Sequence, residues 1–100
     1  MPKVNVSVLY QISQDEALNR IKAYVAGAKA KYSDKVRDLQ QDWNGNVGTF
    51  SGSGSGFAVS GTIAVNPAVV AVELTLPFAA IFLKGKIESG ITDALTRLLA

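Results

Sequence analysis

The middle of the chain alternates apolar and polar residues through four consecutive runs, which three turn signals separate. A period of two is that of a β-strand, because successive side chains point to opposite faces of a sheet. The turn signals are Asn44-Gly45, Gly54-Ser55 and Asn66-Pro67-Ala68-Val69, and each is short enough to join antiparallel neighbours. The pattern therefore predicts a four-stranded antiparallel meander.

Each turn also predicts which residues lie opposite one another. The expected pairs are Trp43 with Asn46, Gln41 with Gly48, Leu39 with Phe50, Gly52 with Phe57, Phe50 with Val59, Val65 with Val70 and Ile63 with Val72. These registers place Gly48 beside Gly61 on neighbouring strands. Because adjacent glycines in a sheet serve a bend or a close approach, we expect strong curvature there, with a helix in the concavity.

All three registers gather the large apolar side chains on one face. That set comprises Leu39, Trp43, Phe50, Phe57, Val59, Ile63, Val65, Val70, Val72, Leu74 and Leu76. A slip of one residue would bury the polar set instead, so the pattern specifies which face is covered. The opposite face, which carries Asp42, Thr62 and Glu73, is expected to meet solvent or a second subunit.

A strand and a helix precede the meander. Residues 4–10 alternate in the same way and predict a half-buried first strand. Ser13 and Glu16 form a Ser-x-x-Glu capping box, in which each residue satisfies a backbone N–H that a helix start leaves without a partner. We expect an amphipathic helix from there to about Tyr32, with Ser33-Asp34 as its exit.

The last quarter of the chain predicts a second helix. Pro77 ends the preceding strand, because proline cannot donate to a sheet and suits the first turn of a helix. The helix should then run to Leu99 with apolar residues at helical spacing. Gly85 and Gly90 each cost about 1 kcal/mol relative to alanine inside a helix. We expect them to allow a close approach of helix and sheet, with a hinge near Gly85 as the alternative.

These elements predict a single α+β domain over residues 1–100, in the order β-α-β-β-β-β-α. The first strand runs antiparallel to the fifth and adds most simply beside it, which gives a five-stranded antiparallel sheet of order 2-3-4-5-1. Two helices would cover one face of this curved sheet. The arrangement resembles a reduced helix-grip fold, an analogy that carries no activity by itself.

Composition excludes several kinds of chemistry. The 100 residues include no Cys and no His, so disulfides, thiolate nucleophiles, imidazole bases and the commonest zinc ligands are all missing. The net charge is only +2, and the cations that cluster, at positions 29, 31, 35 and 37, lie beside Asp34 and Asp38. A solvated helix end is favoured there over a nucleic-acid site. The start of the chain lacks a signal-peptide pattern, which predicts a cytoplasmic protein. The longest apolar run, Ala68 to Leu83, is too short and too interrupted for a transmembrane segment.

The motifs that resemble ligand sites fail on their context. The segment 52–56, Gly-Ser-Gly-Ser-Gly, leads into a strand and has Phe57 where a dinucleotide-binding motif requires glycine. Gly85-Lys86 lacks the other residues of a phosphate-binding loop. Asp38, Asp42 and Glu73 fit a solvated sheet face better than a catalytic pair. We therefore expect no catalytic residue, no metal site and no cofactor.

Two sets of apolar residues are candidates for binding. The segment from Phe78 to Leu83 is apolar all round, which is more than one helix face can bury against one sheet, so part of it should meet a partner. The candidate interaction surface is Phe78, Ile81, Phe82, Leu83, Lys84 and Lys86. A candidate apolar pocket between sheet and C-terminal helix comprises Trp43, Phe50, Phe57, Phe78 and Phe82. Ordinary core packing is the alternative for these aromatic residues.

Several short segments resemble the polyhydroxyalkanoic acid system protein family across nearly the whole chain. They are Met1-Pro2-Lys3-Val4, Trp43-x-Gly45, Phe50, Gly56, Gly61, Leu76-Pro77, Leu83-Lys84-Gly85-Lys86-Ile87-Glu88, Leu95 and Leu98-Leu99. The resemblance implies a small bacterial protein associated with polyhydroxyalkanoate storage granules, and it brings no enzymatic activity with it.

Three functional hypotheses follow. The first is a non-enzymatic accessory protein that binds the granule surface or a granule protein through the start of the last helix. The second is a carrier of an acyl or other apolar ligand between the sheet and the C-terminal helix. The third is a structural homodimer that uses the polar sheet face or the apolar helix.

Overall fold

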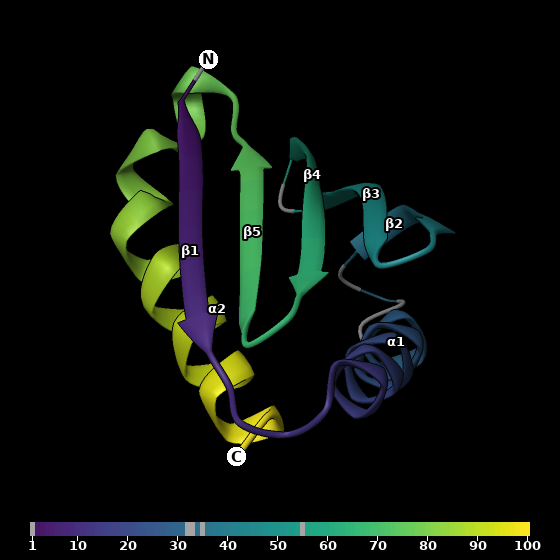
Figure 1. Ribbon diagram of the computed structural model, residues 1–100. Coiled ribbons are helices and arrows are strands. Elements are labelled where there is room, and N and C mark those ends of the chain that lie inside the picture. The colour runs from purple at the N-terminus through teal and green to yellow at the C-terminus, as the bar shows by residue number, and fades with distance from the viewer. Residues whose placement is uncertain (1, 32–33, 35, 55) are drawn as a thin grey trace.

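The structure is a computed structural model that describes residues 2–31, 34, 36–54 and 56–100. These described residues form five strands, two α-helices and one 3-10 helix, labelled η1 (Figure 1). In chain order these are β1 (Lys3–Leu9), α1 (Gln14–Lys31), β2 (Val36–Asn44), β3 (Val47–Gly54), β4 (Phe57–Asn66), β5 (Val69–Thr75), η1 (Phe78–Leu83) and α2 (Lys84–Leu98).

The strands form one antiparallel sheet of order β1-β5-β4-β3-β2. This confirms the α+β class, the meander and the predicted position of the first strand beside the fifth. In Figure 1, α2 runs along β1, while α1 is seen nearly end-on below β2 and β3. The two helices therefore cross at a steep angle and cover different parts of the sheet.

One of the three predicted registers is confirmed and two are wrong. Val65 pairs with Val70 as predicted. Trp43, however, pairs with Gly48, because the first turn is made by Gly45 and Asn46, and Gly45 alone of the two has a positive φ, of 61°. That pattern is typical of a type II′ turn rather than the predicted type I′ turn.

The register of the second hairpin also differs from its prediction, by two positions as in the first hairpin. Gly52 pairs with Val59 rather than with Phe57, so the turn begins after Gly54; Ser55, part of the predicted turn, lies outside the described residues. At the start of β2, an irregularity between Arg37 and Gln40 changes the pairing with β3 by one residue. Elsewhere in the two hairpins, a shift of two positions keeps each side chain on its predicted face, because the side-chain period of a strand is two. The predicted apolar face is therefore unaffected by either error.

The predicted pairing of two glycines is also wrong, since each lies beside a larger residue. Gly48 lies opposite Trp43, and a Cβ at position 48 would come within 2.9 Å of the Trp43 ring. Gly61 lies opposite Phe50, and a Cβ at position 61 would collide with the Glu73 carbonyl oxygen. Both glycines thus allow a close approach between neighbouring strands, and the sheet turns strongly between β5 and β2 (Figure 1).

Helix α1 begins at the predicted cap. The backbone N–H of Glu16 donates to Oγ of Ser13 at 3.1 Å. The Glu16 carboxylate does not complete the capping box but accepts from Nε of Arg20 at 2.9 Å. Lys31 is the last residue of α1, and the predicted end at Tyr32 and Ser33 falls outside the described residues.

The single C-terminal helix predicted from Phe78 onward is divided in two. Residues Phe78–Leu83 form the 3-10 helix η1, and the α-helix α2 begins at Lys84. Neither Pro77 nor Leu83 supplies a side-chain cap, so no capping hydrogen bond marks the start of either helix. The expected close approach at the helix glycines is wrong, because no atom lies within 4 Å of a Cβ added at Gly85 or Gly90.

The core lies beneath β1, β5 and β4. Its buried side chains are Val4, Val6, Val8, Tyr10, Ala17, Ile21, Ile63, Val65, Val70, Val72, Leu74, Leu76, Ala80, Leu95 and Leu99. Strands β2 and β3 contribute none of these and supply half-buried residues such as Trp43 and Phe50 instead. Packing is therefore tight at one side of the sheet and open at the other.

Candidate functional site

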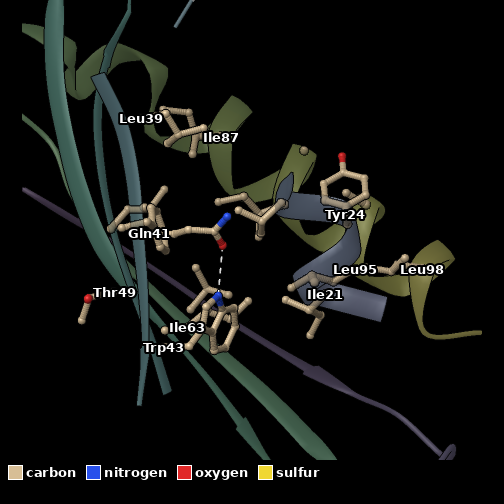
Figure 2. Close-up of a pocket in the computed structure, with 18 residues that line it drawn as sticks. Ile21, Tyr24, Leu39, Gln41, Trp43, Thr49, Ile63, Ile87, Leu95 and Leu98 are labelled. Carbon is tan, nitrogen blue, oxygen red and sulfur yellow. Dashed lines mark hydrogen bonds between the residues drawn. The ribbon is translucent and has the colours of Figure 1, made fainter. Parts of the chain in front are cut away.

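A half-open apolar groove lies where the two helices fail to cover β2 and β3. Its volume is about 420 Å³. Side chains from α1, α2 and all strands except β1 line it, and Figure 2 shows those of Tyr24, Leu39 and Ile87 around the space. The C-terminal end of α2 is hydrogen-bonded to α1. There, Nη1 of Arg20 on α1 donates to the carbonyl oxygens of Leu98, at 3.0 Å, and Ala100, at 3.2 Å.

Trp43 forms the wall of the groove on β2, and three contacts hold its ring. The ring lies against Gly48, where a side chain would not fit. Its Nε1 donates to Oε1 of Gln41 at 3.0 Å, a bond drawn in Figure 2. Nζ of Lys22 lies 5.3 Å from the ring centroid, a cation–π distance. The indole is thus positioned from the strand, the neighbouring strand and helix α1.

The polar side chains along the groove are few. Gln41 extends from β2 toward the helices, whereas Thr49 lies on the other side of the sheet, where its hydroxyl donates to the Asp42 carbonyl at 3.4 Å (Figure 2). Among the described residues, the lining includes no Asp, Glu, Lys or Arg. Such a site can hold an apolar molecule, and its lining offers no acid–base pair.

The structure brings together only part of the predicted pocket. Trp43 and Phe50 line the groove. Phe57 packs half-buried against the core, and Phe78 and Phe82 lie outside the groove on η1. The sequence interpretation missed the contribution of α1, from Ile21, Tyr24 and Val25, and that of Gly90 on α2. Two features of the sequence could have indicated these contributions. Tyr24 lies at the edge of the apolar stripe of the first helix, and Gly90 lies inside the last helix.

An apolar patch lies on η1, at the opposite end of the molecule from Leu9, the last residue of β1. It consists of Phe78, Ile81 and Phe82, which are 70%, 54% and 72% exposed, and we call it the η1 patch. Ala80 is buried beneath it and Leu83 packs half-buried against the core. Figure 1 shows η1 at the end of the sheet where β1 begins.

The two lysines of the predicted interaction surface, Lys84 and Lys86, follow the η1 patch in the sequence. Nζ of Lys84 lies 4.0 Å from Oε1 of Glu88, one helical turn further on. Lys86 is exposed and has no ion-pair partner among the described residues. Of the predicted interaction surface, only Leu83 is largely withdrawn from solvent.

The acidic residues that were considered as a possible catalytic pair, Asp38, Asp42 and Glu73, do not form a cluster in the fold. Glu73 pairs with Lys3 on the polar sheet face at 3.2 Å, and Asp38 and Asp42 are exposed on β2. Within residues 2–31, 34, 36–54 and 56–100, no cluster of three acidic side chains could hold a metal ion. The same part of the chain contains no helix long and apolar enough to cross a membrane.

Comparison with known proteins gives one match. A family model described as "Putative polyhydroxyalkanoic acid system protein" matches residues 4–99, and that description names a polyhydroxyalkanoic acid system and no reaction. No curated protein and no solved structure shows a significant similarity to the chain. Since the model covers nearly all of the sequence, the chain belongs to the polyhydroxyalkanoic acid system protein family.

Proposed function

We propose that this protein is a non-enzymatic accessory protein of polyhydroxyalkanoate metabolism that adheres to the polyester surface of cytoplasmic storage granules through the η1 patch. The observation that carries the proposal is the exposure of Phe78 and Phe82 side by side with Ile81 on one short helix. When large apolar side chains form a cluster that stays exposed in the folded protein, the cluster often marks a surface that binds a partner. Membership of a polyhydroxyalkanoic acid system family supports polyester as the apolar phase.

The expected strength of adhesion follows from the area that the patch can bury. A large apolar side chain gains about 1.5–3 kcal/mol when it moves fully from water to an apolar phase. The three patch residues are already partly covered, so together they supply roughly 4 kcal/mol, enough for reversible rather than permanent attachment. Lys84 and Lys86 can lay their methylene stems along the polymer while their ammonium groups stay in water.

Co-sedimentation with particles of purified polyester, free of granule proteins, tests this proposal. The double variant Phe78→Asp plus Phe82→Asp should sediment at least about tenfold less than the wild type, since two charges would have to enter the apolar phase. Leu9→Asp is the matched control, because Leu9 is 81% exposed at the opposite end of the molecule. Equal sedimentation of the wild type and the double variant would refute the proposal.

A comparison of bare polyester with native granules distinguishes the polyester surface from a granule protein as the partner. Binding to native granules but not to bare polyester would assign the patch to a granule protein. Light scattering of wild type and double variant without polyester tests the homodimer hypothesis. A wild-type dimer that the double variant converts to a monomer would assign the patch to self-association instead.

A further inference from the structure

We infer that the groove between α1, α2 and β2 is the binding site of a single medium-length acyl chain whose carbonyl oxygen accepts a hydrogen bond from Gln41. This goes beyond the adhesion proposed above, because the groove and the η1 patch share no residue. The inference rests on the volume of the groove, on its lining and on the position of one amide group.

The volume suits a ligand of about the size of one medium-length chain. About 420 Å³ lies in the lower part of the range of small-molecule sites, roughly 300–1,000 Å³. If one chain atom with its hydrogens needs about as much room as a water molecule, roughly 30 Å³, then about fourteen chain atoms would fill the space. A decanoyl chain with its head group is of this size.

Small residues on α2 leave part of the groove open. Gly90 and Ala94 leave space that larger side chains would fill, whereas the ring of Trp43 already occupies the space over Gly48. No atom lies within 4 Å of a Cβ added at Gly90, so this glycine is not required by helix packing. Its absent side chain leaves room on the α2 wall, at a cost to helix propensity.

The head group is identified by the amide of Gln41. The indole N–H of Trp43 can only donate, so the atom of Gln41 that it meets at 3.0 Å must be the amide oxygen. The amide nitrogen of Gln41 therefore faces away from Trp43, and it has no partner among the described residues. Because Gln41 is exposed at the rim, its two free N–H donors stand where the head group of a bound chain would emerge.

The local charge favours an oxygen-bearing head group over a cationic one. Lys22 places an ammonium group against the same Trp43 ring, 5.3 Å from its centroid. In the part of the chain that the structure describes, no carboxylate lines the groove. Acyl carboxylates and esters both offer an oxygen that can accept a hydrogen bond from Gln41. A quaternary ammonium group offers no acceptor, and the positive charge of Lys22 would repel it.

Titration with three probes of equal chain length tests the site. Trp43 is the sole tryptophan, so its fluorescence reports on the groove, and calorimetry provides an independent measurement. Below their micelle concentrations, decanoic acid or methyl decanoate should bind at least about tenfold more tightly than decyltrimethylammonium. Tighter binding of the acid than the ester would identify a free acyl carboxylate as the ligand, and tighter binding of the ester would identify an acyl ester. Equal binding of all three probes, or no binding of any, would overturn the inference.

A pair of glycine variants separates loss of the site from loss of the fold. Gly90→Leu should fill the groove and abolish decanoate binding, while helix propensity maintains or raises its melting temperature. Gly85→Leu makes the same change on α2 outside the groove and should bind decanoate like the wild type. Unchanged binding by Gly90→Leu would overturn the inference. Gly90→Leu should not alter sedimentation with polyester, so failure here is distinct from failure of the surface proposal.

Gln41→Glu tests the head-group contact. The variant keeps an oxygen for Trp43 but replaces the free N–H donors with a negatively charged acceptor. Decanoate binding should weaken by about tenfold or more, and decyltrimethylammonium binding should not weaken. Equal weakening of both probes would show that Gln41 only supports the shape of the groove and would overturn its assigned role.

Discussion

Ala68 occupies a backbone conformation that alanine rarely adopts. Its φ is 65°, and it follows Pro67 at the second central position of the β4–β5 turn. A left-handed residue costs roughly 1–2 kcal/mol unless it is glycine. The surrounding contacts hold the turn in place, since the Ala68 carbonyl accepts from the backbone N–H of Tyr10 at 3.0 Å and the Tyr10 hydroxyl donates to the Asn66 carbonyl.

We expect Ala68→Gly to stabilise the protein by about 0.5–1 kcal/mol. Removing the Cβ relieves the left-handed strain, and the greater freedom of glycine in the unfolded chain offsets part of the gain. Thermal unfolding would show a rise of a few degrees in a domain of this size. Ala58→Gly, on an exposed strand position without a positive φ, is the control and should lower stability. A lower melting temperature for Ala68→Gly would contradict this account of the turn.

At the scale of elements, α1 depends on its cap. Its start has the Ser13 hydroxyl as a side-chain acceptor, and the Glu16 carboxylate that could have assisted is bonded to Arg20. We expect Ser13→Ala to lower the free energy of unfolding by about 1 kcal/mol, measured by urea denaturation. Ser13→Asp should restore most of the loss. Ser89→Ala, at an exposed position inside α2, should change stability by only a few tenths of a kcal/mol, and a similar loss there would contradict the capping explanation.

At the scale of the whole molecule, stability should be unevenly distributed across the sheet. Val4, Val65 and Val70 are completely buried in β1, β4 and β5, whereas Gly48 alone is buried in the described parts of β2 and β3. Segments with few buried apolar contacts open at lower free energy than the core. Native-state hydrogen exchange should therefore be slowest in β4 and β5 and at least about tenfold faster in the β2–β3 hairpin. Uniform protection across all five strands would contradict this distribution.

The candidate site follows from the same asymmetry. If the side chains of β2 and β3 were fully covered, no groove would remain beside Trp43. The sequence predicted an apolar pocket and included Trp43 and Phe50, which line the groove. It could not exclude Phe78 and Phe82, because an apolar residue at the start of a helix has the same pattern whether it faces a pocket or solvent.

The fold class, the strand order, the Ser13 cap and the buried face of the sheet could be predicted from the sequence, because these depend on local periodicity and turn chemistry. Two wrong registers left the predicted apolar face correct, since both hairpin errors were of two residues. The folded structure was needed to show the division of the last helix and the exposure of Phe78 and Phe82. It alone also showed the groove, because the angle between α1 and α2 depends on contacts between residues far apart in the chain, such as Arg20 with Leu98.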